Sequence, residues 1–388
     1  MSDPETWRPP AASPWAAPVG DGATPPAGAT GTPGGVGPSP DGAAPTPGWT
    51  PPPRPGIIPL RPLTLGDILA GAFQVIRRNP RPTFGFALVV SLVSTLVVTL
   101  VTGVVTGLLL ARIDSAAAAD VETVTAGSVL GIVITTVVAS TLSAALTSLV
   151  LGVISLEVAR GALGERHTLR GLWQGMRGRI WPLVGWTVLL VAAVFLAIII
   201  VVALITVVFA AAGTTAGVVV AVIVVIVGGL GATVLGFWLT TKLAFVAPAL
   251  VVERRRLGDA IARSWRLTRG HFWRILGIQL LVSTIVGIAV QVVTVPLSVV
   301  GQFGALLINP NGSEGAGIAI LVVIGLLTLA LVSVATAVAL VAQSAVPALL
   351  YLDVRMRSEG LDLELQRVVE DRAAGRPVPE NPYLPPTG

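Results

Sequence analysis

The chain of 388 residues is 53% hydrophobic and only 12% charged, with a mean hydropathy of +0.85. Because water-soluble domains carry about 25% charged residues, this composition excludes a soluble globular protein and indicates a chain that lies largely in lipid. The formal net charge is +5, and the absence of cysteine excludes disulfides, thiolate metal sites and cysteine nucleophiles.

The first segment, residues 1–59, is rich in proline and glycine and contains no apolar run. A secretory signal needs an apolar core near its start, and a segment of this composition buries too little surface to offset its ordering entropy. We therefore predict a disordered cytoplasmic tail. Trp7, Trp15 and Trp49 interrupt it; isolated residues in a flexible tail are favoured over a docking site for a partner.

Six apolar stretches follow, each long enough for the roughly 20 residues that cross a bilayer as a helix. They run over residues 84–111, 127–156, 181–212, 216–252, 275–308 and 315–352. None alternates polar with apolar residues as a membrane β-strand does. The predicted fold class is therefore an all-α integral membrane protein with six transmembrane helices. Pro248, Pro296 and Pro347 predict kinks or breaks in the last three.

Arginine placement predicts the orientation, because cytoplasmic loops carry the excess of basic residues. One side holds the segment before the first span, the second and fourth loops, and the segment after the sixth span; the arginines there are Arg77, Arg78, Arg81, Arg160, Arg166, Arg170, Arg177, Arg179, Arg254, Arg255, Arg256, Arg263, Arg266, Arg269, Arg274, Arg355 and Arg357. The other side has only Arg112, against four carboxylates. Both termini are therefore predicted to be cytoplasmic.

The chain also repeats. LGDILAGAFQVIRRNPRPTFG (65–85) aligns without gaps on LGDAIARSWRLTRGHFWRILG (257–277), and LRGLWQGMRGRIWPLVG (169–185) aligns on the last 17 positions of the latter. The pattern predicts three parallel copies of one unit, a basic amphipathic interfacial helix followed by a transmembrane hairpin. The predicted boundaries are 60–158, 159–252 and 253–358, with a cytoplasmic C-terminal tail at 359–388.

Each amphipathic segment places an aromatic residue and an arginine at equivalent positions. The aromatics are Phe73, Trp173 and Trp265, and the arginines four positions later are Arg77, Arg177 and Arg269. A helix with aromatic and apolar residues on one side and arginine on the other typically lies in the headgroup plane. The possible lipid-headgroup contacts are therefore Arg77, Arg177, Arg254, Arg255, Arg256 and Arg269, with Phe73, Trp173 and Trp265 as interfacial aromatics. The alternative, at even weight, is that these arginines only fix topology and the aromatics only pack against the spans.

Residues that could carry chemistry are few. Lys242 is the only lysine and the only charged residue well inside a span; snorkelling of its stem to the headgroups is favoured over a transport role. Gln279 and Gln291 could hydrogen-bond between helices. His167 and His271 are far apart in sequence, and no nucleophile elbow or phosphate loop is present. We predict no catalytic, cofactor-binding or metal residues, no cofactor and no nucleic-acid partner.

Three blocks of the sequence resemble a bacterial family, the glycerophosphoryl diester phosphodiesterase membrane domain-containing proteins. They are PGIIPLRPLTLGDILAGAFQVIRRNPRPTFG (55–85), APALVVERRRLGDAIARSWRLTRGHFWRILG (247–277) and LLYLDVRMRSEGLDLEL (349–365). The resemblance covers about residues 55–370 and implies a membrane domain, which is fused to a phosphodiesterase in some bacteria. That hydrolase resembles a TIM barrel of about 250 residues. The present chain has no soluble stretch of that length and no His-Arg dipeptide, so no catalytic residue carries over.

Two classes of function remain at this point. The first is a non-enzymatic scaffold or accessory protein of the bacterial plasma membrane, which binds anionic lipid or an unknown membrane or cytoplasmic protein partner at its basic cytoplasmic face. The second is a transporter or permease for a lipid-like or apolar substrate, which should show a cavity with polar lining near the bilayer midplane. A continuous tunnel past Gln279 and Gln291 would favour transport.

Overall fold

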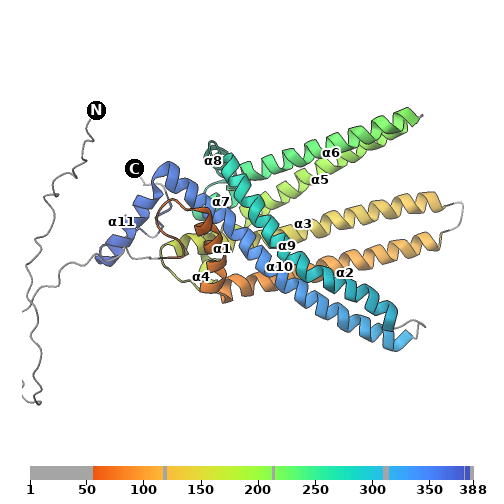
Figure 1. Ribbon diagram of the computed structural model, residues 1–388, viewed down its shortest axis with the longest axis horizontal. Helices are drawn as coiled ribbons and strands as arrows, with labels where there is room; N and C mark the ends of the chain where they lie inside the picture. The colour runs from red at the N-terminus through yellow and green to blue at the C-terminus, as the bar shows by residue number, and fades with distance from the viewer. Residues whose placement is uncertain (1–55, 117–119, 212–214, 309–313, 380, 385–388) are drawn as a thin grey trace, which may run out of the picture. The chain divides into compact units, whose positions relative to one another are not determined.

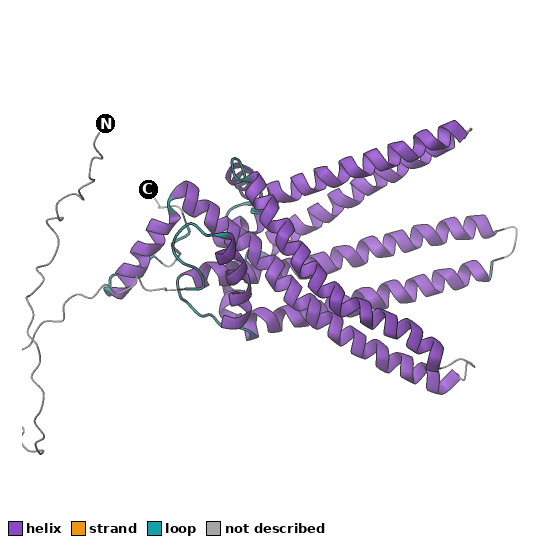
Figure 2. Ribbon diagram, in the orientation of Figure 1, coloured by secondary structure: helices purple, strands orange, loops and turns teal. Residues whose placement is uncertain are grey.

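The computed structural model describes residues 56–116, 120–211, 215–308, 314–379 and 381–384. The described residues form helices and turns and no strand (Figure 2). Contacts separate the chain into Met1–Pro51 and Pro52–Gly388; the predicted disordered tail, with its three tryptophans, lies almost entirely outside the described residues.

Among the described residues, six helices are long and apolar enough to cross a membrane, which confirms the six predicted spans. The helices are α1 (Leu65–Arg78), the π-helical turn η1 (Arg81–Gly85), α2 (Phe86–Asp114), α3 (Val121–Ala162), α4 (Leu169–Met176), α5 (Ile180–Ala211), α6 (Thr215–Leu243), α7 (Val246–Val252), α8 (Leu257–Leu267), α9 (Phe272–Ile308), α10 (Glu314–Glu359) and α11 (Leu361–Ala373). The spans coincide with α2, α3, α5, α6 continued by α7, α9 and α10.

Successive long helices lie side by side, as α2 with α3, α5 with α6, and α9 with α10 (Figure 1). Helix α10 also contacts α2 and α3, and α5 contacts α3. The short helices α1, α4, α7 and α8 gather at one end of the long ones (Figure 1). This end carries nearly all the described arginines of the fold, so the chain's charge is concentrated there.

Helix α1 begins at a reciprocal cap. The Asp67 amide donates to the Thr64 hydroxyl at 3.2 Å, and the Thr64 amide donates to the Asp67 carboxylate at 2.9 Å. Each bond satisfies an amide that the first helical turn leaves unpaired. The Thr64 hydroxyl also donates to the Asp67 carboxylate at 2.8 Å, and the hydrogen bonds from the Thr64 amide and then from this hydroxyl lower the pKa of Asp67. Thr168 caps α4 in the same way, accepting from the Gly171 amide at 3.3 Å.

The fourth span breaks between α6 and α7, as Pro248 predicts. Proline has no amide hydrogen, so the carbonyl four residues earlier, in Ala244, loses its helical donor. The buried hydroxyl of Ser264 in α8 bridges the break, because it donates to the Lys242 carbonyl at 2.7 Å and accepts from the Phe245 amide at 3.2 Å. Helices α9 and α10 continue without a break through Pro296 and Pro347.

The buried core lies at the arginine-rich end. All seven residues of α7 are buried, and the core also includes the last turns of α3 and the stretch from Val341 to Met356 of α10. Toward the other end, apolar side chains such as Ile198 and Leu230 are exposed. A soluble protein would not expose so much apolar surface, whereas lipid covers it without cost.

The predicted C-terminal tail is partly structured. It contains α11, which starts after Gly360 with a positive φ of 66° and buries Leu361, Leu365 and Val368. Beyond it, the ring of Tyr383 is buried and its hydroxyl donates to the Ala159 carbonyl at 2.5 Å. The tail therefore returns to the core beside the end of α3.

Candidate functional site

The arginines predicted to contact lipid fall into two groups. Five of the six have exposed side chains and no carboxylate partner among the described residues; they are Arg77, Arg177, Arg254, Arg256 and Arg269. We call these five the basic surface. Arg254 has a left-handed backbone with φ 53°, which turns the chain between α7 and α8. The basic surface has cationic groups available for an anion.

Arg255, the sixth, is half-buried and paired with Glu253. The Glu253 network consists of Glu253, Arg255, Arg263, Tyr351, Arg355 and Glu359. The Glu253 carboxylate is only 1% exposed, accepts from the Tyr351 hydroxyl, and lies 3.0 Å from an Arg263 nitrogen and 3.5 Å from an Arg355 nitrogen. Glu359 accepts from both Arg263 and Arg355. The network ties α7, α8 and α10 together.

The ionisation of Glu253 and Arg263 in this network depends on the groups around them. Burial by itself raises the pKa of Glu253, but hydrogen bonds from Tyr351 and Arg255 and the charges of Arg355 and Arg263 outweigh burial and hold that pKa below its ordinary value. Burial lowers the pKa of Arg263, yet Glu359 and Glu253 more than offset it, so the pKa is raised. Glu253 and Arg263 therefore stay ionised at neutral pH.

A second buried carboxylate, Asp353 of α10, organises the segment before α1. It accepts from the Leu63 amide at 2.7 Å, from Arg274 at 3.0 Å and from Arg357 at 2.9 Å. Both arginines also donate to the Leu63 carbonyl, at 2.7 and 2.8 Å. Arg274 and Arg357 are thus occupied in joining α9, α10 and the segment before α1, and they are not free for lipid.

Polar contacts also fix α1 and the loop before α4 to the end of α3. Asn79 donates to Glu157 at 3.2 Å and to the His167 carbonyl at 2.8 Å, and Arg78 donates to the Gly161 carbonyl at 3.0 Å. Burial tends to raise the pKa of Glu165, but hydrogen bonds from His167 and Arg372 lead the effects that lower it overall.

The three aromatics predicted to be interfacial differ in exposure. Phe73 is 49% exposed and Trp173 38% exposed, and the edge of Trp173 meets Phe86. Trp265 is half-buried and meets Trp238 with ring centroids 5.3 Å apart. The fully buried side of α8 consists of Ala260, Arg263, Ser264 and Leu267. Two polar side chains face the core there, because Arg263 donates to Glu253 and Ser264 donates to the Lys242 carbonyl at the broken end of α6.

Two further aromatics escaped the sequence analysis. Trp181 at the start of α5 and Trp273 at the start of α9 are 81% and 80% exposed. They occupy equivalent positions in the aligned segments 169–185 and 261–277, 92 residues apart, so the sequence alignment already contained this signal. Exposed tryptophan at the end of a membrane helix is typical of the headgroup level.

Lys242 ends α6 on the same side. Its ammonium lies 5.3 Å from the ring centroid of Trp265 and 5.8 Å from that of Phe272, which is cation–π geometry. No carboxylate of the described residues pairs with it. The lysine is half-buried, so its position agrees with a stem that extends toward the headgroups.

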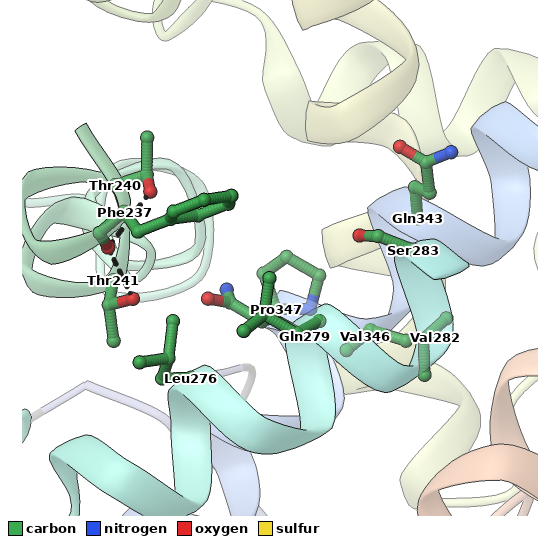
Figure 3. Close-up of a pocket in the computed structure, with 11 residues that line it drawn as sticks. Phe237, Thr240, Thr241, Leu276, Gln279, Val282, Ser283, Gln343, Val346 and Pro347 are labelled. Atoms are coloured by element: carbon green, nitrogen blue, oxygen red, sulfur yellow. Dashed lines mark hydrogen bonds between the residues drawn. The ribbon is translucent and has the colours of Figure 1, made fainter. Parts of the chain in front are cut away.

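A cavity of about 230 Å³ lies where α6 faces α9 and α10, and its wall includes Thr241, the residue before Lys242 (Figure 3). Phe237, Thr240 and Thr241 of α6 form one wall. The other wall comes from α9 and α10 and is lined by Leu276, Gln279, Leu280, Val282, Ser283, Gln343, Val346 and Pro347. A more open groove of about 740 Å³ lies farther along α9, beside Gly287 and Gln291. Within the described part of the chain, no group of three or more His, Cys, Asp or Glu side chains could hold a metal ion.

Residues 218–371 match the family model for the membrane domain of glycerophosphoryl diester phosphodiesterase. The resemblance predicted from the sequence is confirmed over this part of the chain, which is less than half of it. The matched membrane domain contains most of α6, the Glu253 network, Asp353 and the cavity. It does not include the catalytic domain of the phosphodiesterase. No match was found among curated proteins or among solved structures.

The match and the six apolar helices together make the chain a multi-pass membrane protein. The residues that the structure brings together at the arginine-rich end are the paired arginines and their carboxylates. The basic surface and the cavity are the two features that remain available to bind something else.

Proposed function

We propose that the protein is a non-enzymatic membrane scaffold or accessory protein of the bacterial plasma membrane, with both termini cytoplasmic, whose basic surface binds anionic lipid headgroups. One observation carries the proposal: Arg77, Arg177, Arg254, Arg256 and Arg269 are exposed and have no carboxylate partner among the described residues, whereas Arg255, Arg263, Arg274, Arg355 and Arg357 are paired with the buried carboxylates Glu253 and Asp353. The exposed Trp181 and Trp273 on the same end support a position at the headgroups.

The proposed architecture is three parallel repeats, in which α1, α4 and α8 lie in the headgroup plane before their hairpins. Exposed Phe73 and Trp173 support this arrangement, since each stands four residues before an exposed arginine. Such helices reach acyl chains with the aromatic ring and phosphates with the guanidinium group. An unidentified protein partner is the alternative occupant of the basic surface.

The test is lipid retention in native mass spectrometry of the purified full chain. A variant with all five arginines of the basic surface replaced by Gln should retain anionic lipid at least tenfold less, because each arginine near an anionic surface contributes about 1 kcal/mol. Arg112→Gln, an exposed arginine at the opposite end, is the control and should change nothing. Unchanged retention in the fivefold variant would overturn the proposal, and loss of a co-purifying protein alone would favour the protein partner.

A second candidate function, transport of a lipid-like or apolar substrate, is favoured by the cavity beside Gln279 and the groove beside Gln291. The cavity and the groove both lie along α9. A path for a substrate across the membrane would need polar side chains along it, and Gln279 and Gln291 are such side chains. Reconstituted vesicles discriminate the two functions: movement of a fluorescent phospholipid between leaflets that depends on the protein would favour transport over a scaffold.

A further inference from the structure

Helix α9 carries polar side chains to several depths of the bilayer. From Trp273, which is exposed at the start of the helix, Gln279, Ser283 and Gln291 lie about 9, 15 and 27 Å along the axis at 1.5 Å per residue. Gly287 stands between the last two, so the set follows a row of residues spaced by four, which lie on one ridge of a helix. The ridge extends through most of the roughly 30 Å hydrocarbon core.

The protein leaves the polar groups nearest the arginine-rich end unsatisfied. The side chains of Gln279, Ser283 and Gln343 form no hydrogen bond with any described residue, and Ser283 and Gln343 are exposed. An amide or hydroxyl in hydrocarbon without a partner costs several kcal/mol. A ligand with hydrogen-bonding groups at this depth would remove that cost.

The surrounding space is hollow and mostly apolar. Figure 3 shows Gln279 directed toward the α6 wall, with Gln343 and Ser283 near each other on the opposite side. Apolar side chains complete the walls, among them Phe237 and Leu276. Thr284, the first residue of the more open groove beside Gly287, directly follows the cavity residue Ser283 along α9, and we call the cavity and that groove together the inter-hairpin groove. Its lining suits a molecule with an apolar chain and a few polar atoms at one end.

The side chain of Lys242 lies near the end of the inter-hairpin groove that is closest to the arginines. Lys242 directly follows the wall residues Thr240 and Thr241, and its ammonium lies over Phe272, one turn before the wall residue Leu276. No carboxylate of the described chain neutralises it. From this end inward, a ligand therefore meets a positive charge, then hydrogen-bonding side chains, then apolar walls.

We propose that the inter-hairpin groove binds one anionic glycerophospholipid. Its phosphate pairs with Lys242, its glycerol and ester oxygens accept from Gln279, Ser283 and Gln343, and an acyl chain extends along α9 past Gly287. The order of charge, hydrogen-bond donors and apolar surface in the groove matches the order of these parts in the lipid. The proposal uses none of the basic surface, so the two can fail independently.

A second copy of the chain fits the same groove less well. In a two-fold symmetric dimer, each copy presents the same surface to the other. A dimer formed through the groove would therefore bring two Lys242 ammonium groups to the interface without an anion. Like charges facing each other without compensation oppose association. The lipid supplies the missing anion and the missing hydrogen-bond acceptors together.

The experiment uses the full chain in nanodiscs of equal phosphatidylglycerol and phosphatidylcholine, with photoreactive benzoylphenylalanine in place of Leu280, an exposed apolar residue of the cavity wall that makes none of the proposed polar contacts. The matched control carries it in place of Ile198, an exposed apolar residue of α5. After irradiation, the masses of the adducts identify what lay beside each position. We expect phosphatidylglycerol to exceed phosphatidylcholine roughly fivefold at position 280, which is the ratio for about 1 kcal/mol, and to equal it at position 198.

Variants then locate the contacts. Lys242→Gln should abolish the enrichment at position 280 and Lys242→Arg should keep it. The double change Gln279→Leu and Gln343→Leu should lower the total lipid yield at 280, while Gln174→Leu, an exposed glutamine of α4, should not. Equal lipid composition at 280 and 198 would overturn the proposal without any of these further changes, and adducts with the mass of two chains would replace the lipid by a second copy.

Discussion

At the scale of single residues, the buried carboxylate of Glu253 has the largest expected effect on stability. It faces Arg255, Arg263 and Arg355, two of which are themselves buried. Removing one partner of a buried ion pair costs about 3–5 kcal/mol, because the other charge stays buried without compensation. We expect Glu253→Gln to lower the thermal unfolding midpoint of the detergent-solubilised protein clearly, and Glu364→Gln, an exposed residue of α11 without an ion pair, to leave it unchanged. Equal midpoints for the two variants would contradict this role.

The same residue predicts how stability depends on pH. The pKa of Glu253 in the fold lies below its ordinary value of 4.5, so unfolding takes up a proton when the pH falls below that value. The stability that ionised Glu253 contributes is therefore fully present above about pH 4.5 and is lost as the pH falls through the lowered pKa. Unfolding midpoints measured between pH 7 and pH 3 should decline at the acid end, and the decline should be smaller in Glu253→Gln. A parallel decline in both proteins would count against the network.

Which arginines are paired and which are exposed could not be predicted from the sequence. Their number and their gathering at one end of the spans followed from the sequence, because these need only their order along the chain. Which of them are free depends on acidic partners far away in sequence: Arg263 meets Glu359, and Arg274 meets Asp353. Arg254 and Arg255 are adjacent, yet one is exposed and the other is paired. No local pattern distinguishes them.

At the scale of elements, the C-terminal segment after α11 is held mainly by Tyr383. Its ring is buried and its hydroxyl bonds the Ala159 carbonyl, while Asn381 donates to the Val252 carbonyl at 3.3 Å. Tyr383→Ala should release this segment, since truncating a large buried aromatic costs about 3–5 kcal/mol. Tyr383→Phe, which removes only the hydroxyl, should cost about 1 kcal/mol.

Hydrogen exchange separates this local release from global destabilisation. In Tyr383→Ala the amides of α11 and of the end of α3 should exchange faster, while those of α9 should keep the rate of the unchanged protein. Leu384→Ala, an exposed neighbour, is the control. Uniform acceleration across all helices would show that Tyr383 supports the whole fold and not one segment.

Elements could be predicted where their signal is local. Runs of apolar residues located the spans, and the Thr64 and Asp67 pair that caps α1 is a signal of the same local kind. Pro248 located the break between α6 and α7, although nothing in the sequence identified Ser264 as the residue that bridges it. The buried Tyr383 was missed because its contacts, with Ala159, lie 224 positions away. The inter-hairpin groove was missed for the same reason, although its glutamines had been noted.

At the scale of the whole molecule, burial and charge both increase toward the same end. The buried core and ion-pair networks join α3, α7, α8 and α10 there, whereas the exposed residues toward the other end are apolar. Lipid must therefore support much of the surface of the long helices, and the arginine-rich end keeps the hairpins together. The match to the phosphodiesterase membrane domain begins in α6 and so includes the two elements, α7 and α8, that the Glu253 network connects to α10.

The predicted orientation of the whole molecule can be tested directly, because the chain has no cysteine. Ser115→Cys places a thiol at an exposed position after α2, and Arg266→Cys places one at an exposed position in α8. If both termini are cytoplasmic, a membrane-impermeant maleimide should label position 115 in intact cells freed of their outer layers and position 266 only after permeabilisation. The unchanged chain should stay unlabelled in both conditions, which controls for the reagent. Labelling of 266 and not 115 in intact cells would reverse the orientation, and with it the membrane leaflet assigned to the basic surface and to Lys242.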